Sequence, residues 1–129
     1  SAFNDIKDSD PQALFGYVAE QLGRKGLGYI HVIEGQTGGD RNNLPFNYDT
    51  IYQKFKMHGG GASMANNGYN KHLAEATSVD LVAFGVPFIS NPDLVYRLEH
   101  DLPLAQADST SFYGGGEKGY TDYLLSPKN

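Results

Sequence analysis

The residues of this chain that could do chemistry lie beside clusters of glycine. The sequence has 129 residues, with 16 glycines, nine tyrosines and seven phenylalanines. Glycines gather at Gly38-Gly39, Gly59-Gly60-Gly61 and Gly114-Gly115-Gly116. Because glycine allows a backbone to approach another group closely, such clusters beside aromatic rings suit loops around a flat ligand. The alternative interpretation is flexible surface loops, and glycine clusters taken alone favour it.

Two ionisable residues lie in or next to one apolar run. His31 lies within Tyr29 to Ile33, and we interpret it as a core residue. Glu34 ends the same run, where a parallel barrel has its catalytic end. Glu34 therefore either reaches a site or caps a loop.

No set of residues has the spacing of a metal site. His58, His72 and His100 show no ligand spacing with one another or with acids. Asp5, Asp8 and Asp10 have the spacing of a calcium loop, but its glycine and distal glutamate are absent. We therefore predict no metal and interpret Asp10 as a helix cap.

Composition limits the class of protein. Apolar residues make up 40% and charged residues 19%, which is typical of a globular chain, here one domain over residues 1–129. The net charge is -5 and the ten Lys and Arg residues are scattered, which argues against a nucleic-acid partner. No apolar stretch is long enough to span a membrane, and no signal peptide opens the sequence. The absence of cysteine fits a cytoplasmic location.

Helical and strand patterns alternate along the chain. Asp10-Pro11 begins a helix whose apolar stripe is Leu14, Val18 and Leu22, and a second such start lies at Asn91-Pro92-Asp93, with Leu94, Val95 and Leu98 on its apolar side. The other predicted elements are a strand at Tyr29–Ile33, a helix at Tyr48–Phe55, a weak strand at Ser63–Asn66, a helix at Lys71–Thr77 and a strand at Leu81–Phe84.

This alternation predicts a parallel α/β architecture. The two stronger strands are nearly continuous apolar runs, which predicts strands covered on both faces. Only three strands are recognisable, whereas a closed eight-stranded barrel needs about 250 residues. The pattern therefore indicates part of a larger α/β unit.

Three segments resemble the Old Yellow Enzyme family, the flavin-dependent ene reductases. They are Asp80 to Leu94, Phe112 to Tyr123, and Phe3 to Ile6. The resemblance implies the C-terminal half of a (β/α)8 TIM barrel, comprising strands six to eight and a tail that returns over the flavin. It also implies an unclosed sheet, which predicts self-association or a complementary N-terminal half.

The resemblance assigns cofactor-binding residues to two loops. Asn67 and Gly68 follow strand seven, and Gly85 and Val86 follow strand eight, where the family binds the phosphate of flavin mononucleotide (FMN). The structural alternative is that both are ordinary turns. Where the family usually has a phosphate-binding arginine, this chain has Val86. Loss of such a contact costs about 1.5–3 kcal/mol, or about one to two decades of affinity.

The tail motif supplies the remaining predicted site residues. Tyr113 resembles the tyrosine that lines the substrate pocket beside the flavin ring, and Phe112 resembles part of the same wall. The alternative for Phe112 is that it pins the tail to the barrel. A second departure from the family is the stretch His58 to Gly61, which we expect to be irregular because glycine triplets weaken strands.

The implied function is an FMN-binding oxidoreductase that reduces activated alkenes with NAD(P)H. The family's catalytic residues match positions before Ser1, so we predict no catalytic residue within this chain and no activity of the chain alone. The alternative function is a non-catalytic half-barrel fragment, or a binding or assembly module that has lost flavin chemistry.

Overall fold

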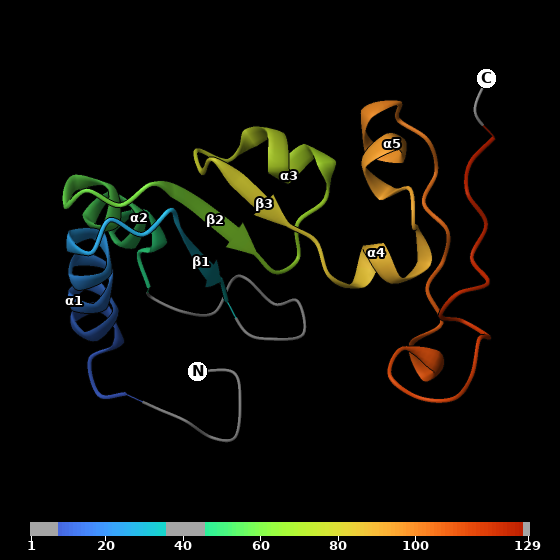
Figure 1. Cartoon of the computed structure of the whole chain (residues 1–129), viewed down its shortest axis with the longest axis horizontal. Helices are drawn as coiled ribbons and strands as arrows, with labels where there is room; N and C mark the ends of the chain where they lie inside the picture. Colours follow the sequence, from blue (N-terminus) through green and yellow to red (C-terminus); the bar gives the residue numbers. More distant parts are fainter. Residues whose placement is uncertain (1–7, 36–45, 128–129) are drawn as a thin grey trace. The chain divides into compact units, whose positions relative to one another are not determined.

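The computed structural model describes residues 8–35 and 46–127 (Figure 1). The Phe3 to Ile6 segment, Asp5 and Gly38-Gly39 lie outside these residues. The chain divides into two compact units, residues 1–83 and 84–129, and each is described by itself. The expected single domain stays a prediction.

The elements, in order, are α1 (Pro11–Arg24), β1 (Tyr29–Ile33), α2 (Tyr48–Met57), β2 (Ala62–Asn66), α3 (Lys71–Ala76), β3 (Leu81–Ala83), α4 (Val86–Ser90), α5 (Leu94–Glu99) and the 3-10 helix η1 (Ser109–Ser111).

Helix α1 begins where the sequence predicts. The Asp10 side chain accepts a hydrogen bond from Ala13 N at 3.0 Å, and Pro11 occupies the first turn. The buried side, however, consists of the small residues Gly16, Ala19 and Gly23. The predicted apolar stripe is therefore only partly right: Leu22 packs against the core, whereas Leu14 and Val18 are exposed.

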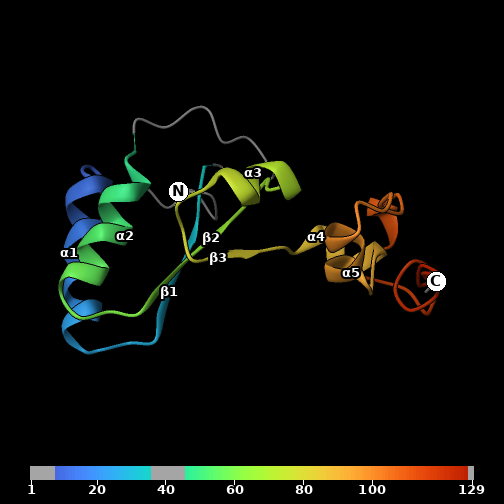
Figure 2. The ribbon, with the colours of Figure 1, turned by 90° about the horizontal axis from the view of Figure 1, so that it is seen from above.

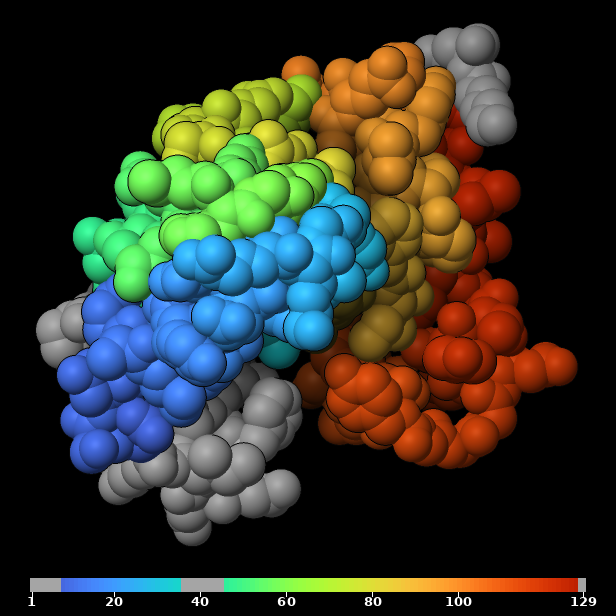
Figure 3. Space-filling view, turned by 60° about the vertical axis from the view of Figure 1, so that its left-hand side comes forward, coloured from blue at the N-terminus to red at the C-terminus, as the bar shows by residue number. Residues whose placement is uncertain are grey.

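Small residues on α1 allow α2 to pack closely against it. A Cβ atom at Gly23 would lie 2.4 Å from the carbonyl oxygen of Phe55, so only glycine fits there. Ala19, Ile51 and Phe55 form the buried centre of this unit, and Ile30 and Val32 of β1 pack against it. Figure 3 shows the two helices in contact, with the blue atoms of α1 beside the green atoms of the α2 segment.

The three strands form one parallel sheet in the order β1-β2-β3. In Figure 2, α1 and α2 lie on one side of these strands. Pairing of His31 with Met64 and of Met64 with Leu81 places these three residues in one row across the sheet. Asp80, just before β3, accepts hydrogen bonds at 2.7 Å from both Ser63 N and Ser63 Oγ, which fixes β3 beside β2.

The prediction that the strands are covered on both faces is wrong for β1 in this structure. Its residues alternate, with Tyr29, His31 and Ile33 exposed and Ile30 and Val32 half-buried beneath the helices. Tyr29 is 57% exposed and Ile33 46%. His31 is consequently not a core residue, because its face of the sheet has no covering layer among the described residues.

The glycine triplet forms a regular connection rather than an irregular stretch. Gly59, Gly60 and Gly61 donate backbone hydrogen bonds to Lys56, Phe55 and Leu27, and β2 begins at the next residue. A Cβ at Gly60 would lie 2.5 Å from the Phe55 ring, and one at Gly61 would lie 2.2 Å from Gly28 O. Gly60 and Gly61 are therefore required by packing, and Gly59 by its left-handed backbone with φ +97°. Glycine content alone did not distinguish these requirements from flexibility.

The second unit differs from prediction at its helix starts. The one-turn helix α4 was not predicted, because Pro87 interrupts its apolar run. Asn91 does not cap α5; its buried side chain accepts from Ala105 N at 2.7 Å and donates to Pro87 O at 2.9 Å. Asp93 occupies the cap position instead, and Val95 is exposed rather than packed.

In the described part of the chain, no helix is long and apolar enough to cross a membrane. The same residues contain no group of three or more side chains that could hold a metal ion. The cytoplasmic location stays a prediction of the sequence.

The close approach at Gly61 gives a testable stability difference. We expect Gly61→Ala to lower the free energy of unfolding by about 1–3 kcal/mol, because its methyl group would overlap the backbone of Gly28. Gly28→Ala is the matched control, since its Cβ would meet nothing within 4 Å. Urea unfolding followed by circular dichroism measures both, and equal midpoints for the two variants would contradict the packing role.

Candidate functional site

A buried carboxylate lies at the carboxyl ends of the first two strands. Glu34 follows β1 directly and is 6% exposed. Its Oε1 accepts from Tyr52 Oη at 2.9 Å, and its Oε2 accepts from Tyr69 Oη at 2.8 Å. One phenol comes from α2 and the other from the loop after β2, so the carboxylate joins three parts of the unit. Of the two roles open for Glu34, this geometry is that of a loop clamp.

Main-chain and side-chain hydrogen bonds continue across the strand ends. Glu34 N donates to Asn66 O at 3.1 Å, and the Asn66 side chain donates to Ala83 O at 2.7 Å. Asn67 Nδ2 donates to Glu34 O at 2.6 Å. The ends of all three strands are thereby connected in a row, at the edge where parallel α/β sheets bind ligands.

Two consecutive left-handed residues, Asn67 and Gly68, directly follow β2. Asn67 has φ +90° and Gly68 has φ +67°, both in the left-handed region that asparagine and glycine adopt most readily. Turns of this kind can aim successive N–H groups at an anion. Because the Asn67 side chain is bonded to the main-chain oxygen of Glu34, a phosphate at this loop would depend on backbone donors.

The electrostatics of this cluster follow from burial. Burial raises the pKa of Tyr52, and the adjacent negative charge of Glu34 raises it further. Tyr52 therefore stays a neutral hydrogen-bond donor throughout the physiological range.

The loop after β3 has fewer donors. Gly85 occupies the N-cap position of α4 and has no side chain that could cap the helix. Pro87 has no N–H, so the first turn has one donor fewer. Val86 is 48% exposed, and a Cβ at Gly85 would meet nothing within 4 Å. Packing does not demand a glycine here, and Gly85 and Val86 offer backbone N–H groups but no cationic side chain.

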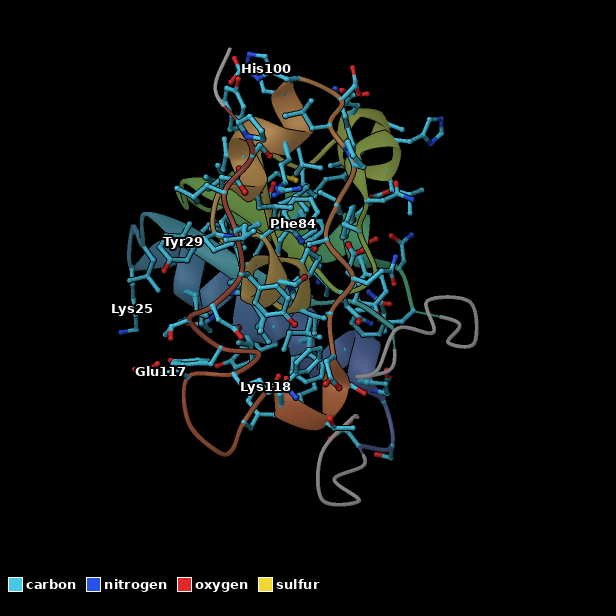
Figure 4. All side chains as sticks on the ribbon, turned by 90° about the vertical axis from the view of Figure 1, so that its right-hand side faces the viewer. Lys25, Tyr29, Phe84, His100, Glu117 and Lys118 are labelled. Atoms are coloured by element: carbon cyan, nitrogen blue, oxygen red, sulfur yellow. The ribbon has the colours of Figure 1, made fainter. Side chains whose placement is uncertain are left out.

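Tyr113 and Phe112 lie on a closed loop of the second unit. Their rings contact edge to face, with centroids 5.8 Å apart, and Tyr113 is 87% exposed. Gly119 N donates to Asp122 Oδ1 at 2.7 Å, and Tyr123 Oη accepts from Asp108 N at 3.2 Å, which closes the loop behind the two rings. Figure 4 labels Glu117 and Lys118 on this loop, at the opposite end of the unit from His100.

An ion pair anchors the tail to α5. Arg97 Nε bonds Asp93 Oδ1 at 2.7 Å, and its two terminal nitrogens donate to Pro103 O at 2.7 Å and Leu124 O at 3.0 Å. Asp93 Oδ2 accepts from Ser126 N at 2.6 Å. The guanidinium thus holds three separate acceptors, which a lysine could not do with the same geometry.

The predicted site residues fall into two groups. Asn67 and Gly68 belong to the first unit, whereas Gly85, Val86, Phe112 and Tyr113 belong to the second. Within their units, the structure brings Phe112 and Tyr113 into contact and leaves Gly85 exposed. Asn67 and Gly68 suit the phosphate of FMN, because their left-handed turn can present backbone N–H groups. The second group lacks the arginine that the family usually has at the position of Val86.

Sequence reasoning missed the residues that hold these loops. Tyr52, Tyr69 and Arg97 carry no motif of their own, and their partners lie 18, 35 and up to 27 residues away. The one local signal was the spacing of Asp93 and Arg97, which are an i,i+4 pair.

Comparison with curated proteins places the chain within a set of reductases. It is 36% identical over 136 residues to a putative 12-oxophytodienoate reductase 11 of Oryza sativa subsp. japonica, covering 100% of this chain and 36% of the relative. It is 31% identical over 128 residues to a probable flavin mononucleotide-dependent alkene reductase of Leishmania infantum, covering 95% and 33%. No family model matches the chain.

Solved structures agree with this placement. A morphinone reductase in complex with tetrahydroNAD matches with a TM-score of 0.80 and 36% identity, over 94% of this chain and 32% of that one. The Old Yellow Enzyme homologue of Zymomonas mobilis matches with a TM-score of 0.82 and 30% identity, over 92% and 34%.

The fold and sequence therefore match part of the barrel of these reductases. The chain belongs to the Old Yellow Enzyme family, and it spans about a third of the length of the curated relatives it matches.

The tail anchor has a predictable dependence on pH. The Arg97 guanidinium, followed by the Ser126 N–H, lowers the pKa of Asp93 below its usual range. The Asp93 contribution to tail docking is therefore fully present above about pH 4 and is lost as the pH falls towards the lowered pKa. We expect the Ser126 amide resonance to stay constant from pH 7 to 4 and to move only below that. In Asp93→Asn this low-pH movement should disappear, and a resonance that shifts near pH 4 to 5 would contradict the ion pair.

Proposed function

We propose that this chain supplies the phosphate-loop part of an FMN-dependent oxidoreductase that reduces activated alkenes with NAD(P)H. The rest of the barrel, on the same polypeptide or on a separate one, would supply the residues that bind the substrate carbonyl and deliver the proton. Bound FMN would carry hydride from the nicotinamide to the alkene. Homology over the whole chain to flavin-dependent reductases is the observation that carries the proposal.

The turn after β2 supports a phosphate-binding role. Asn67 and Gly68 have consecutive positive φ angles, and the bond from Asn67 Nδ2 to Glu34 O holds the turn at the strand ends. Under the proposal, backbone N–H groups of this turn bind the FMN phosphate. Phosphates bound in this way need little from side chains. Gly85-Val86 belongs to the second unit, and its phosphate-binding role stays a prediction from the family resemblance.

The tail loop supports a role in the pocket for the two adjacent aromatic residues. Both would line the substrate pocket, Tyr113 beside the flavin ring and Phe112 as part of the same wall. The exposed Tyr113 phenol could both stack and donate a hydrogen bond. The edge-to-face contact restrains the pair, which is consistent both with a pocket wall and with Phe112 pinning the tail.

The second candidate function is a binding or assembly module without flavin chemistry. Val86, where the family usually has arginine, favours it. The glycine triplet, the other departure from the family, does not favour it, because Gly60 and Gly61 are required for packing.

Titration with FMN distinguishes the two functions. We expect the chain to bind FMN weakly, and we expect Val86→Arg to tighten binding about ten- to hundredfold by restoring a charge-assisted contact to phosphate. Quenching of flavin fluorescence measures the dissociation constant.

Val95→Arg is the matched control, since it adds the same charge at an exposed valine of α5. Equal tightening by both variants would indicate general attraction of the anion. No saturable binding by the wild type or by Val86→Arg would favour the module over the enzyme part.

The open face of the sheet suggests a partner for the first unit. Tyr29, Ile33 and Leu81 are 57%, 46% and 44% exposed, and residues of this size are seldom left open together on one sheet face. We propose that either a second copy or the complementary part of the barrel covers this face. Paired parallel strands would also satisfy the outer edges of β1 and β3, which pair with no other strand among residues 8–35 and 46–127.

Sedimentation velocity tests the covered face. We expect the chain to self-associate at high concentration and Ile33→Asp to shift it towards monomer by placing an unpaired charge in the interface. Leu124→Asp is the control, because Leu124 is 82% exposed and lies outside the sheet. A wild-type chain that stays monomeric at every concentration would exclude the second copy.

A further inference from the structure

The cluster around Glu34 does more than satisfy a buried charge. Two tyrosines that are themselves buried, Tyr52 at 5% exposed and Tyr69 at 9%, each donate to a different carboxylate oxygen. A carboxylate removed from water in this way stabilises the protein only when its oxygens are well satisfied. The two hydrogen bonds therefore fix the loop that contains Tyr69 relative to the helix that contains Tyr52.

One of those partners is directly attached to the candidate phosphate loop. Tyr69 follows Gly68, and Asn67 precedes it, so the loop is held at two points by the same residue. Asn67 Nδ2 donates to the main-chain oxygen of Glu34 at 2.6 Å, and Tyr69 Oη donates to its carboxylate at 2.8 Å. Asn67 is the first anchor, and Gly68 lies between it and Tyr69. Both Asn67 and Gly68 have a left-handed backbone conformation.

The other partner ties the loop to the rigid part of the unit. Tyr52 lies on α2 one residue after Ile51 and three before Phe55, both buried in the core against α1. The path from core to loop runs through Tyr52, the Glu34 carboxylate and Tyr69. Hydrogen bonds to a charged group are roughly twice as strong as neutral ones, which suits such a connection.

We propose that Glu34 is a positioning residue for the cofactor-phosphate loop. Through Tyr69 and Asn67 it holds the Asn67-Gly68 turn in its left-handed conformation, so that the backbone donors are preorganised for the FMN phosphate. The inference rests on the proposed function for its ligand, while the clamp itself is a property of the chain. Glu34 does not contact the reacting atoms in this role.

Two variants remove the clamp by different routes. Tyr69→Phe deletes one hydroxyl and keeps the ring. Glu34→Gln keeps the shape, but one of its terminal atoms becomes an N–H donor that opposes a phenol donor. Tyr48→Phe is the matched control, because Tyr48 Oη accepts from Gly35 N at 2.6 Å near the same strand end and is not bonded to the loop.

The first measurement needs no ligand. We expect backbone 15N order parameters at Asn67 and Gly68 to fall from about 0.85 towards 0.6 in Tyr69→Phe and Glu34→Gln, with Ile51 and Phe55 unchanged. In Tyr48→Phe the loop should stay as rigid as in the wild type. Unchanged order parameters at residues 67 and 68 in both clamp variants would overturn the proposal.

The second measurement separates phosphate positioning from general loss of structure. We expect both clamp variants to weaken FMN about tenfold while leaving riboflavin, which lacks the phosphate, unchanged. Equal weakening of both flavins would overturn the positioning role. If the wild type binds neither flavin, the FMN proposal fails, and the order parameters still decide whether Glu34 fixes the loop.

Discussion

The packing of Phe55 between two glycines is the contact on which the first unit depends. The Phe55 ring and carbonyl occupy the space that Cβ atoms at Gly60 and Gly23 would need, so one fully buried residue fixes α1, α2 and the start of β2 together. With these elements fixed, Ile30 and Val32 pack beneath the helices and β2 pairs in register with β1. The carboxyl ends of the strands then coincide at Glu34 and Asn66.

This scaffold separates stability from binding in a way common to parallel α/β proteins. At the amino ends of the strands, Asp80 holds β2 and β3 through Ser63 and bonds Lys56. At the carboxyl ends, Glu34 holds loops through phenols instead of through backbone pairing alone. One carboxylate thus joins strands at their amino ends, and another joins a helix and a loop at the carboxyl ends.

In the second unit, an ion pair connects a helix to the segments that follow it. Arg97 and Asp93, both mostly buried, connect α5 to two points of a tail that has almost no regular secondary structure. The tail depends on specific polar contacts because its large apolar residues, Tyr113, Leu124 and Leu125, are exposed. Exposed apolar residues here and on the sheet face are consistent with a chain that spans about a third of its relatives.

The sequence alone determined the order of the elements apart from α4 and η1, many of their bounds to within two residues, and the family, because caps, turn residues and apolar runs are local signals. It did not determine which faces are covered: β1 looked buried on both sides, yet its outer face, including His31, is open. It also did not show that Gly60 and Gly61 serve packing, or that Glu34 meets Tyr52 and Tyr69. Those features depend on residues far apart in the chain approaching within a few ångströms, and only the tertiary structure decides such distances.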